Sequence, residues 1–231
     1  MIRQTDKTII SAEPEPIEVL LPATAVIVVD MQNGLLKKGG FAEKILGADV
    51  SAFEKIIKPC GNLITAAREK GLKIVYLRLA YKADLSDSGG PDSPQWHKEH
   101  GLVLVRQHPE MLKDIMVDGT WNTEIIDELE PDPADIVIRK PFFSGFVGTE
   151  LDIILRTANV KFLIIVGIIT NICVGCTVRD AYHLGYFPIV VSDAVASAGP
   201  EYAQEAELWN FKYTFAWVTT IQELLRSLSQ A

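Results

Sequence analysis

The sequence predicts an α/β protein built on a parallel sheet of six strands. Short runs rich in Val and Ile alternate along the chain with longer segments of helical periodicity, as repeated strand–helix–strand units do. The runs are mostly apolar on both faces, and such strands belong to a parallel sheet that helices cover, because each crossover connection returns along one face. The chain has 231 residues, 48% of them hydrophobic, and is long enough to bury one continuous core. We therefore expect a three-layer α/β sandwich.

The first residues precede this alternation. A stretch rich in Pro and Glu at residues 13–16 indicates an arm that leads into the domain. No internal repeat, low-complexity tract or polar linker divides the chain after it. We expect an N-terminal arm at residues 1–22 and a single domain at residues 23–231.

Six apolar runs are the candidate strands of the sheet. They are residues 24–29 (TAVIVV), 73–79 (KIVYLRL), 135–138 (DIVI), 161–166 (KFLIIV), 187–191 (FPIVV) and 212–216 (KYTFA).

The segments between the strands supply the helices. One helical stripe contains Phe53, Ile56, Ile57, Leu63, Ile64 and Ala67, and we expect Pro59 to kink this helix or to start a new one. Gly71 ends it. Between Tyr81 and Asn122 the pattern breaks down, which predicts a long excursion with short helices only, and such excursions are usually functional. Later helices are expected at residues 150–157, 174–184, 200–210 and 219–229.

The charge balance narrows the classes of partner. The chain carries 30 Asp and Glu residues against 22 Lys and Arg, so it has no basic surplus for a nucleic-acid backbone or an anionic membrane face. A small molecule is the more plausible partner. The N-terminal residues do not have the pattern of a secretory leader, and no apolar run approaches the ~18 residues of a membrane span. We expect a cytosolic (cytoplasmic) protein.

Three reactive side chains follow or end predicted strands. Asp30 follows residues 24–29 directly, Lys140 follows residues 135–138, and Cys173 follows the fourth strand and opens the next helix. Each has an ordinary structural interpretation: a turn or cap aspartate, a solvated strand-end lysine, and a small buried hydrophobe. In an open α/β sheet, however, reactive groups collect at the carboxyl ends of the strands.

Together these three residue types suit acyl transfer. A helix N-terminus and a nearby cation such as Lys140 both favour the reactive thiolate of Cys173. Asp30 can accept the thiol proton and return it to a leaving amine. Backbone N–H groups at the turn before the helix can bind the developing oxyanion.

The cysteines also permit two other interpretations, a redox motif and a zinc site. The chain has three, Cys60, Cys173 and Cys176, and the last two form Cys-Val-Gly-Cys. A thioredoxin-like redox motif would lie at the first helix of its fold, whereas this pair follows the fourth strand. A zinc site would need two more ligands, and the histidines at 97 and 100 do not form a metalloprotease motif. We expect no metal, and we expect Cys176 to pack beneath the helix.

Several ordered motifs resemble the isochorismatase-like cysteine hydrolases over residues 23–225. They are AVIVVDMQNG at 25–34, GTWNTEIIDEL at 119–129, IRKPFFSGFVGTELDIILR at 138–156 and GIITNICVGCTVRDAYHLGY at 167–186. The resemblance implies a Rossmann-like hydrolase fold. It also implies a catalytic triad of Asp30, Lys140 and Cys173, a cis peptide bond before Ile169, and an oxyanion hole formed by the backbone N–H groups of Ile169 and Cys173.

Within that family the chain is most similar to the ureidoacrylate amidohydrolases of pyrimidine degradation. The likeness lies in GGPDSPQWHK at 89–98, SGF at 144–146, TVRDAYHLGYF at 177–187 and AGP at 198–200. It implies Gln32, Leu35 and Tyr81 as substrate-binding residues, and no cofactor. Two departures stand out: Leu79 occupies the place of a polar amide side chain, and Tyr81 the place of a tryptophan. For Arg78 two interpretations are open: it binds a substrate carboxylate, or it is a half-exposed arginine at the end of a strand.

We therefore expect an amidohydrolase that cleaves a C–N bond of a small ureido or carbamoyl amide through a thioester or thiocarbamate intermediate. The alternatives are another small amide (biuret, triuret, an N-carbamoyl amino acid or a nicotinamide-like compound), an isochorismatase-type vinyl ether, and a non-catalytic binding domain on the same fold. The resemblance and the aromatic C-terminal segment also suggest a homo-oligomer.

Overall fold

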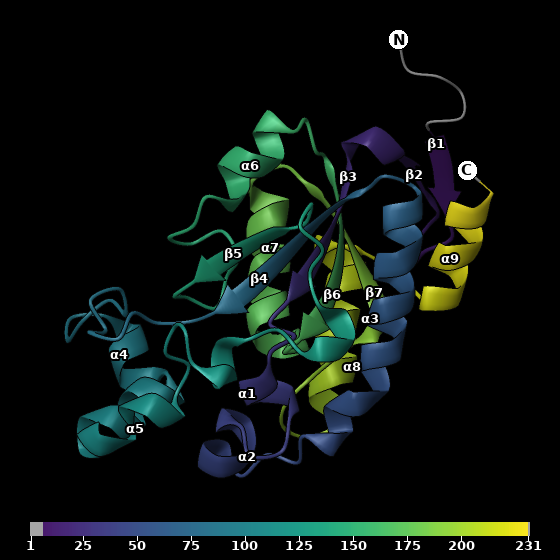
Figure 1. Cartoon of the computed structure of the whole chain (residues 1–231). Coiled ribbons are helices and arrows are strands. Elements are labelled where there is room, and N and C mark those ends of the chain that lie inside the picture. The colour runs from purple at the N-terminus through teal and green to yellow at the C-terminus, as the bar shows by residue number, and fades with distance from the viewer. Residues whose placement is uncertain (1–6, 231) are drawn as a thin grey trace.

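The computed structural model describes residues 7–230, so the first six residues of the predicted arm lie outside the described residues, as does residue 231. A parallel sheet of six strands forms the centre of the molecule (Figure 1). In spatial order its strands are β5 (Ile136–Lys140), β4 (Lys73–Leu79), β3 (Thr24–Val29), β6 (Phe162–Ile168), β7 (Phe187–Ala196) and β8 (Trp217–Thr219). The predicted α/β class with a six-stranded parallel sheet is confirmed.

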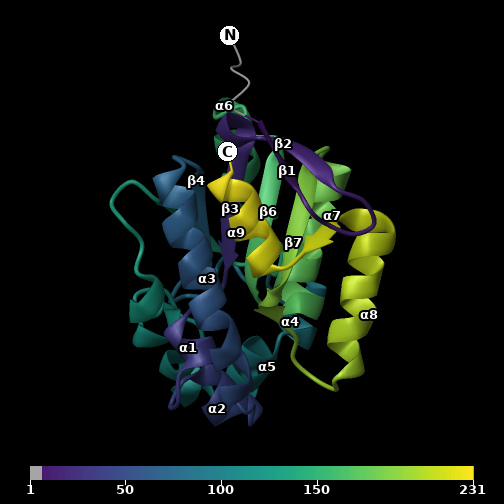
Figure 2. The same ribbon diagram turned by 90° about the vertical axis from the view of Figure 1, so that its right-hand side faces the viewer.

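Helices cover both faces of this sheet (Figure 2). On one face lie α3 (Ser51–Glu69) and α9 (Ile221–Ser229), whose buried side chains share a core with Val26 and Val28 of β3. The other face is covered by α6 (Leu151–Thr157) and α7 (Gly175–His183), with α8 (Tyr202–Asn210) outside α7. Successive residues of β3 thus enter two different cores, which is why its sequence is apolar throughout.

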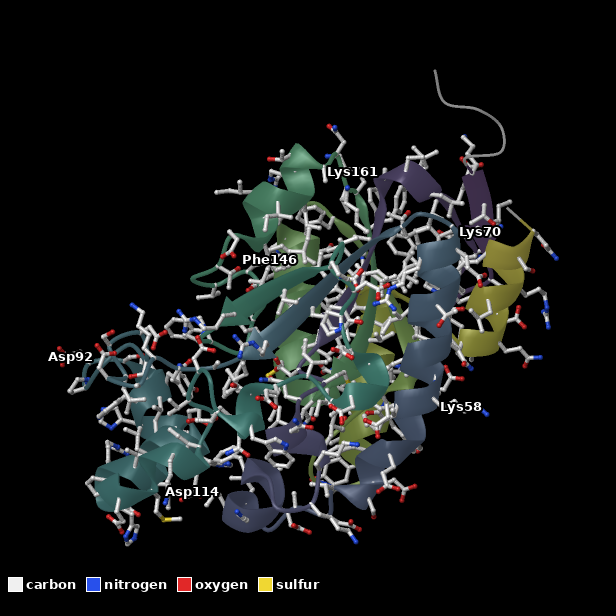
Figure 3. The ribbon with its side chains drawn as sticks, in the orientation of Figure 1. Lys58, Lys70, Asp92, Asp114, Phe146 and Lys161 are labelled. Carbon is white, nitrogen blue, oxygen red and sulfur yellow. The ribbon has the colours of Figure 1, made fainter. Side chains whose placement is uncertain are left out.

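The predicted excursion lies at one end of the sheet. It contains α4 (Pro94–Lys98), α5 (His100–Gln107) and 3₁₀ helices at Pro109–Asp114 and Trp121–Thr123. The short helices α1 (Asn33–Leu36) and α2 (Phe41–Leu46) lie near the same end (Figure 1). Figure 3 shows Asp92 and Asp114 of the excursion far from Lys161, which directly precedes β6. The excursion therefore lies toward the carboxyl ends of the strands.

The N-terminal segment carries regular structure that the sequence did not predict. β1 (Lys7–Ile10) and β2 (Ile17–Leu20) form an antiparallel pair. Thr8 Oγ1 donates a 2.9 Å hydrogen bond to the Ser227 carbonyl of α9, and the backbone of Glu13 exchanges two hydrogen bonds with Val218 of β8. This segment is thus attached to the C-terminal end of the domain.

The prediction of the last strand is wrong. Residues 212–216 were expected to be extended because they are aromatic and β-branched, but Phe211–Phe215 is a π-helical turn that continues α8. Phe211 and Phe215 are four residues apart, and both rings contact the Arg179 guanidinium. This helical spacing decides the local structure, and β8 begins only at Trp217.

Pro59 does not start a new helix. α3 runs unbroken from Ser51 to Glu69 with Pro59 inside it. Its buried face continues on both sides of the proline, through Ile56 and Leu63, so tertiary packing outweighs the lost hydrogen bond. The four later helices lie within about two residues of their predicted bounds. A 3₁₀ helix at Leu21–Ala23 precedes β3, and another at Asp127–Leu129 precedes β5.

Candidate active site

In open α/β sheets ligands bind beyond the carboxyl ends of the strands at the point where the strand order reverses, and in this sheet that point lies between β3 and β6. From β3 the chain continues to β4 and β5 on one side of the sheet, whereas β6, β7 and β8 lie on the other side of β3. The direction in which strands are added therefore reverses between β3 and β6. Gly167 of β6 lets the two backbones approach there, since a Cβ at this position would lie 2.1 Å from the Val29 carbonyl oxygen. Asp30 follows β3 directly, and Cys173 lies shortly after β6. Two of the three candidate catalytic residues therefore flank the reversal.

Asp30 is held by the backbone of its neighbouring strand. Its φ angle is 52°, a left-handed conformation that Asp tolerates better than most residues. Its N–H donates to the Leu77 carbonyl at 2.9 Å, and its Oδ1 accepts the N–H of Leu79 at 3.0 Å. The side chain is wholly buried. One carboxylate oxygen is thus fixed by β4, while Oδ2 points toward Lys140.

Lys140 is the last residue of β5 and is wholly buried. Its Nζ lies 2.8 Å from Asp30 Oδ2 and donates a 3.2 Å hydrogen bond to the Phe142 carbonyl. Burial alone lowers the pKa of Lys140, but the negative charge of Asp30, and that of Cys173 when its thiol is ionised, outweigh it and raise that pKa. The ammonium is therefore charged. A buried ion pair adds little net stability over apolar side chains, which makes this pair a candidate for a functional role.

Cys173 lies in the π-helical turn Thr170–Val174 that precedes α7. Its side chain is buried, and its carbonyl accepts a 2.7 Å hydrogen bond from Thr177 Oγ1 one turn later. The same hydroxyl accepts the Gly145 N–H at 2.9 Å, which ties the loop after β5 to this turn. Burial raises the pKa of Cys173 and the Asp30 carboxylate adds to the rise, while the Lys140 ammonium opposes it. The structure thus brings Asp30, Lys140 and Cys173 into one electrostatically coupled cluster.

The turn at Ile169 has the cis geometry that the resemblance implies. The Ile168–Ile169 peptide bond is cis, and the carbonyl of Ile169 accepts the N–H groups of Ile172 and Val174 at 3.0 and 3.1 Å. These two hydrogen bonds fix the turn that carries Cys173. The roles of the Ile169 and Cys173 N–H groups in an oxyanion hole stay predictions.

The three predicted substrate-binding residues are all buried. Gln32 donates from Nε2 to the Leu79 and Thr123 carbonyls, both at 3.0 Å, and its Oε1 accepts the Leu79 N–H at 2.9 Å. Its amide therefore holds the loop after β3 to the end of β4. Leu35 packs in the core on the α3 face of the sheet. Tyr81 is wholly buried; burial first, and then the nearby charges of Glu99, Cys173 and Asp30, raise its pKa.

Two residues weighed from sequence have defined surroundings. Arg78 Nη2 lies 2.7 Å from Asp118 Oδ1, so its guanidinium is ion-paired within the chain. Leu79, at the end of β4, is buried in the core and offers its backbone rather than a polar side chain.

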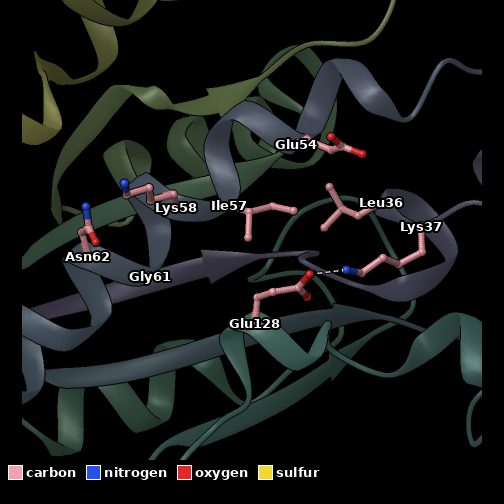
Figure 4. A pocket seen from close by; sticks show the side chains of 8 residues that line it. All are labelled: Leu36, Lys37, Glu54, Ile57, Lys58, Gly61, Asn62 and Glu128. Carbon is pink, nitrogen blue, oxygen red and sulfur yellow. Dashed lines mark hydrogen bonds and ion pairs between the residues drawn. The ribbon is translucent and has the colours of Figure 1, made fainter.

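The described residues offer other features away from the cluster. Among residues 7–230 no group of three or more His, Cys, Asp and Glu side chains gathers as metal ligands would. No helix in that range is long and apolar enough to cross a membrane. A surface pocket between α1 and α3, bounded by the Lys37–Glu128 ion pair and by Lys58, contains none of the three candidate catalytic residues (Figure 4).

Sequence reasoning missed two residues of this region. Thr177 links Cys173 to Gly145, and its position four residues after Cys173 on a helix was the available signal. Glu99 is buried, accepts the Leu102 N–H at 2.7 Å and interacts with Tyr81, and burial raises its pKa. Nothing in the local pattern of the excursion distinguishes Glu99 from a solvated glutamate.

Known proteins resemble the chain in sequence and in structure. Residues 24–223 match the isochorismatase domain model. The ureidoacrylate amidohydrolase RutB of Azorhizobium caulinodans is 40% identical over 219 residues, which are 95% of this chain and 96% of that protein. The crystal structure of a cysteine hydrolase from Pseudomonas syringae has a TM-score of 0.77 and 29% identity, over 92% of this chain and 95% of that one. The N-carbamoylsarcosine amidase of Thermoplasma acidophilum has a TM-score of 0.64 and 28% identity, over 86% and 96%.

Proposed function

The chain belongs to the isochorismatase domain family, and on that premise we propose that it is a cysteine amidohydrolase that cleaves a C–N bond of a small ureido or carbamoyl amide. The observation that carries the proposal is the buried cluster in which Lys140 Nζ lies 2.8 Å from Asp30 Oδ2 beside the Cys173 thiol. A ureidoacrylate-type compound is the first-choice substrate, and a step of pyrimidine degradation the first-choice role. The names of the RutB relative and of the N-carbamoylsarcosine amidase support this class, since both act on an N-carbamoyl group.

The first chemical step is attack by Cys173. Because burial raises the pKa of this thiol, the resting nucleophile is protonated, and a base must take its proton as the sulfur attacks. Asp30 is that base: the Leu79 N–H fixes its Oδ1, and Oδ2, which also faces Lys140 Nζ, takes the proton. Lys140 stabilises the negative charge that passes between carboxylate and sulfur.

The later steps use the same groups. The N–H groups of Ile169 and Cys173 bind the oxyanion of the tetrahedral intermediate. Asp30 returns its proton to the departing amine nitrogen as the C–N bond breaks, which leaves a thioester or, for a ureido substrate, a thiocarbamate on Cys173. Water then hydrolyses this intermediate, and the carbamate formed from a ureido group decays to carbon dioxide and ammonia. We keep three candidate substrate-binding residues, Gln32, Leu35 and Tyr81. Gln32 would act indirectly, by positioning the loop after β3.

Ammonia release tests the substrate class. The panel contains ureidoacrylate, biuret, triuret, N-carbamoyl amino acids and nicotinamide, with isochorismate as the vinyl ether. We expect release from at least one ureido compound, and release from none of them refutes the first choice. Turnover of isochorismate alone would support the vinyl-ether alternative, and labelling of Cys173 by a thiol-reactive amide analogue distinguishes an enzyme from a binding domain.

Two cysteine variants test the nucleophile. Cys173→Ser is expected to lose turnover by at least about 10³-fold while its circular dichroism spectrum is unchanged, because a serine hydroxyl is a far poorer nucleophile in a site tuned for a thiol. Cys176→Ala, three residues away, is the matched control and keeps its turnover under reducing conditions. Substantial residual turnover in Cys173→Ser contradicts the proposed mechanism.

We also propose that the protein forms a homo-oligomer through the aromatic surface of α8 and the turn after it. Tyr202, Trp209 and Tyr213 are exposed there, and the last two rings stack with centroids 4.7 Å apart. Exposed aromatic groups of this kind are typical of interfaces. Sedimentation velocity of the chain and of Trp209→Ala is expected to show a larger species only for the unmodified chain; a monomer in both contradicts the proposal.

A further inference from the structure

Cys176 has no role in the proposed hydrolysis, yet it shares a helix face with Cys173. The backbone angles of the two intervening residues set the separation of their Cα atoms. Val174 has φ −62° and ψ −49°, and Gly175 has φ −60° and ψ −44°, both helical. Ideal helix geometry then places the two Cα atoms about 5 Å apart, inside the range of about 4.4–6.8 Å that a disulfide spans.

The surroundings place the two sulfur atoms on the same side of the helix. Residues three apart on a helix lie on the same face, and the electrostatic coupling of the two thiols agrees with that placement. Cys173 is buried, whereas Cys176 is only half-buried. The Cys176 thiol is thus the more exposed of the two to a reductant.

The turn between the two cysteines packs closely against α8. Gly175, between them, has no side chain, and a Cβ there would lie 2.4 Å from Glu207 Oε1. Arg179 donates a 3.2 Å hydrogen bond to the Gly175 carbonyl and pairs with Glu207. Burial and then the Asp180 carboxylate raise the pKa of Cys176, while the Arg179 guanidinium opposes the rise and so favours the thiolate form that attacks sulfur.

We propose that Cys176 is a resolving thiol, which forms a reversible disulfide with Cys173 after a peroxide has oxidised the nucleophile. This inference rests on the proposed function, because the base that activates Cys173 toward a carbonyl, Asp30, also activates it toward a peroxide. The Cys173 sulfur attacks one peroxide oxygen, the O–O bond breaks, and a sulfenic acid and one water form. The Cys176 sulfur then displaces the sulfenic oxygen as a second water. Each sulfur loses one electron, and the peroxide gains both.

The consequence is protection of the nucleophile. A sulfenic acid without a partner thiol is oxidised further to sulfinic acid, which dithiols do not reduce. A disulfide stops that sequence, and a small dithiol restores both cysteines. Oxidant would therefore switch the hydrolase off without destroying it.

Mass spectrometry after hydrogen peroxide tests the proposal without relying on activity. Both cysteines lie in the tryptic peptide that follows Lys161 and ends at Arg179. In the full-length chain we expect this peptide to lose two hydrogens, and the three free thiols per chain to fall to one under denaturing titration. Dithiothreitol reverses both changes. In Cys176→Ser we expect the same peptide to gain two oxygens instead, with no reversal.

Cys60→Ser is the matched control, because Cys60 is buried in α3 and its sulfur faces the Ala194 carbonyl. It should behave like the unmodified chain toward peroxide. A peptide that gains oxygen equally with and without Cys176 overturns the resolving role. If the disulfide forms but no ureido compound is hydrolysed, the proposed function fails while the thiol pair stands.

Discussion

Replacing Lys140 by methionine, which is close to lysine in volume, leaves the buried carboxylate of Asp30 without its counter-ion. Removing one partner of a buried pair usually costs about 3–5 kcal/mol. The carboxyl can escape this cost by folding with a bound proton. For an ordinary carboxylic acid with a pKa near 4, that proton costs about 4 kcal/mol at pH 7 and about 1.4 kcal/mol less for each pH unit below it. We therefore expect Lys140→Met to lose about 3–4 kcal/mol at pH 7 and clearly less at pH 5.

Urea unfolding followed by circular dichroism measures this loss at pH 5, 6 and 7. The sign follows from proton linkage: the folded variant holds a proton that the unfolded chain has released, so its free energy of unfolding falls as pH rises. Lys73→Met, an exposed lysine at the start of β4, is the matched control and should change by less than about 0.5 kcal/mol. A loss for Lys140→Met below about 1 kcal/mol, or one that does not vary with pH, refutes the coupling of Asp30 and Lys140.

Three further expectations follow from the geometry. Gly167→Ala should lose at least about 3 kcal/mol in urea unfolding, since its φ is +111° and a methyl group would clash with the Val29 carbonyl; a smaller loss means that β3 and β6 can separate. Thr177→Val should lose about 1–3 kcal/mol and lower kcat, because it removes hydrogen bonds to Cys173 and Gly145; unchanged kcat contradicts a positioning role. Burial raises the pKa of Cys173 above the value of about 8.5 for an unfolded thiol. Above that pH the unfolded chain loses a proton that the native state keeps, so the free energy of unfolding should fall as pH rises above about 8.5. Iodoacetamide labelling of Cys173 should accelerate over the same range, and a pH-independent rate contradicts it.

The sheet could be predicted from sequence because its strands are continuous apolar runs. The bounds of β3 and β4 agree with residues 24–29 and 73–79, since each run ends where a polar side chain or a turn begins. The strand predicted at residues 212–216 is wrong because aromatic residues favour strands locally, whereas the contacts of Phe211 and Phe215 with Arg179 favour a helical turn. The division into an arm at 1–22 and a domain at 23–231 stays a prediction, as does the cytosolic location.

The site could be predicted only in part. That Asp30 and Cys173 meet follows from parallel strands whose carboxyl ends share one edge. The contact between Lys140 and Asp30 could not be predicted in the same way, because β4 lies between β5 and β3. Only the buried side chain of Lys140 spans the distance to Asp30. The links through Gln32 and Thr177 end on backbone carbonyls and N–H groups, which no sequence pattern specifies.

These hydrogen bonds to the backbone help to explain why a buried polar cluster persists at the carboxyl end of an apolar sheet. Asp30 Oδ1 and Gln32 Oε1 both accept the N–H of Leu79, so the end of β4 is held by the loop that carries the acid. The Cys173 carbonyl is held in turn by Thr177. The positions of Asp30 and Cys173 are therefore set by hydrogen bonds to a strand and a helix, while Lys140 is placed by β5 and by its hydrogen bond to the Phe142 carbonyl. Such a frame keeps a carboxylate, an ammonium and a thiol at fixed separation although their mutual burial adds little stability, and fixed separation is what general-base attack requires.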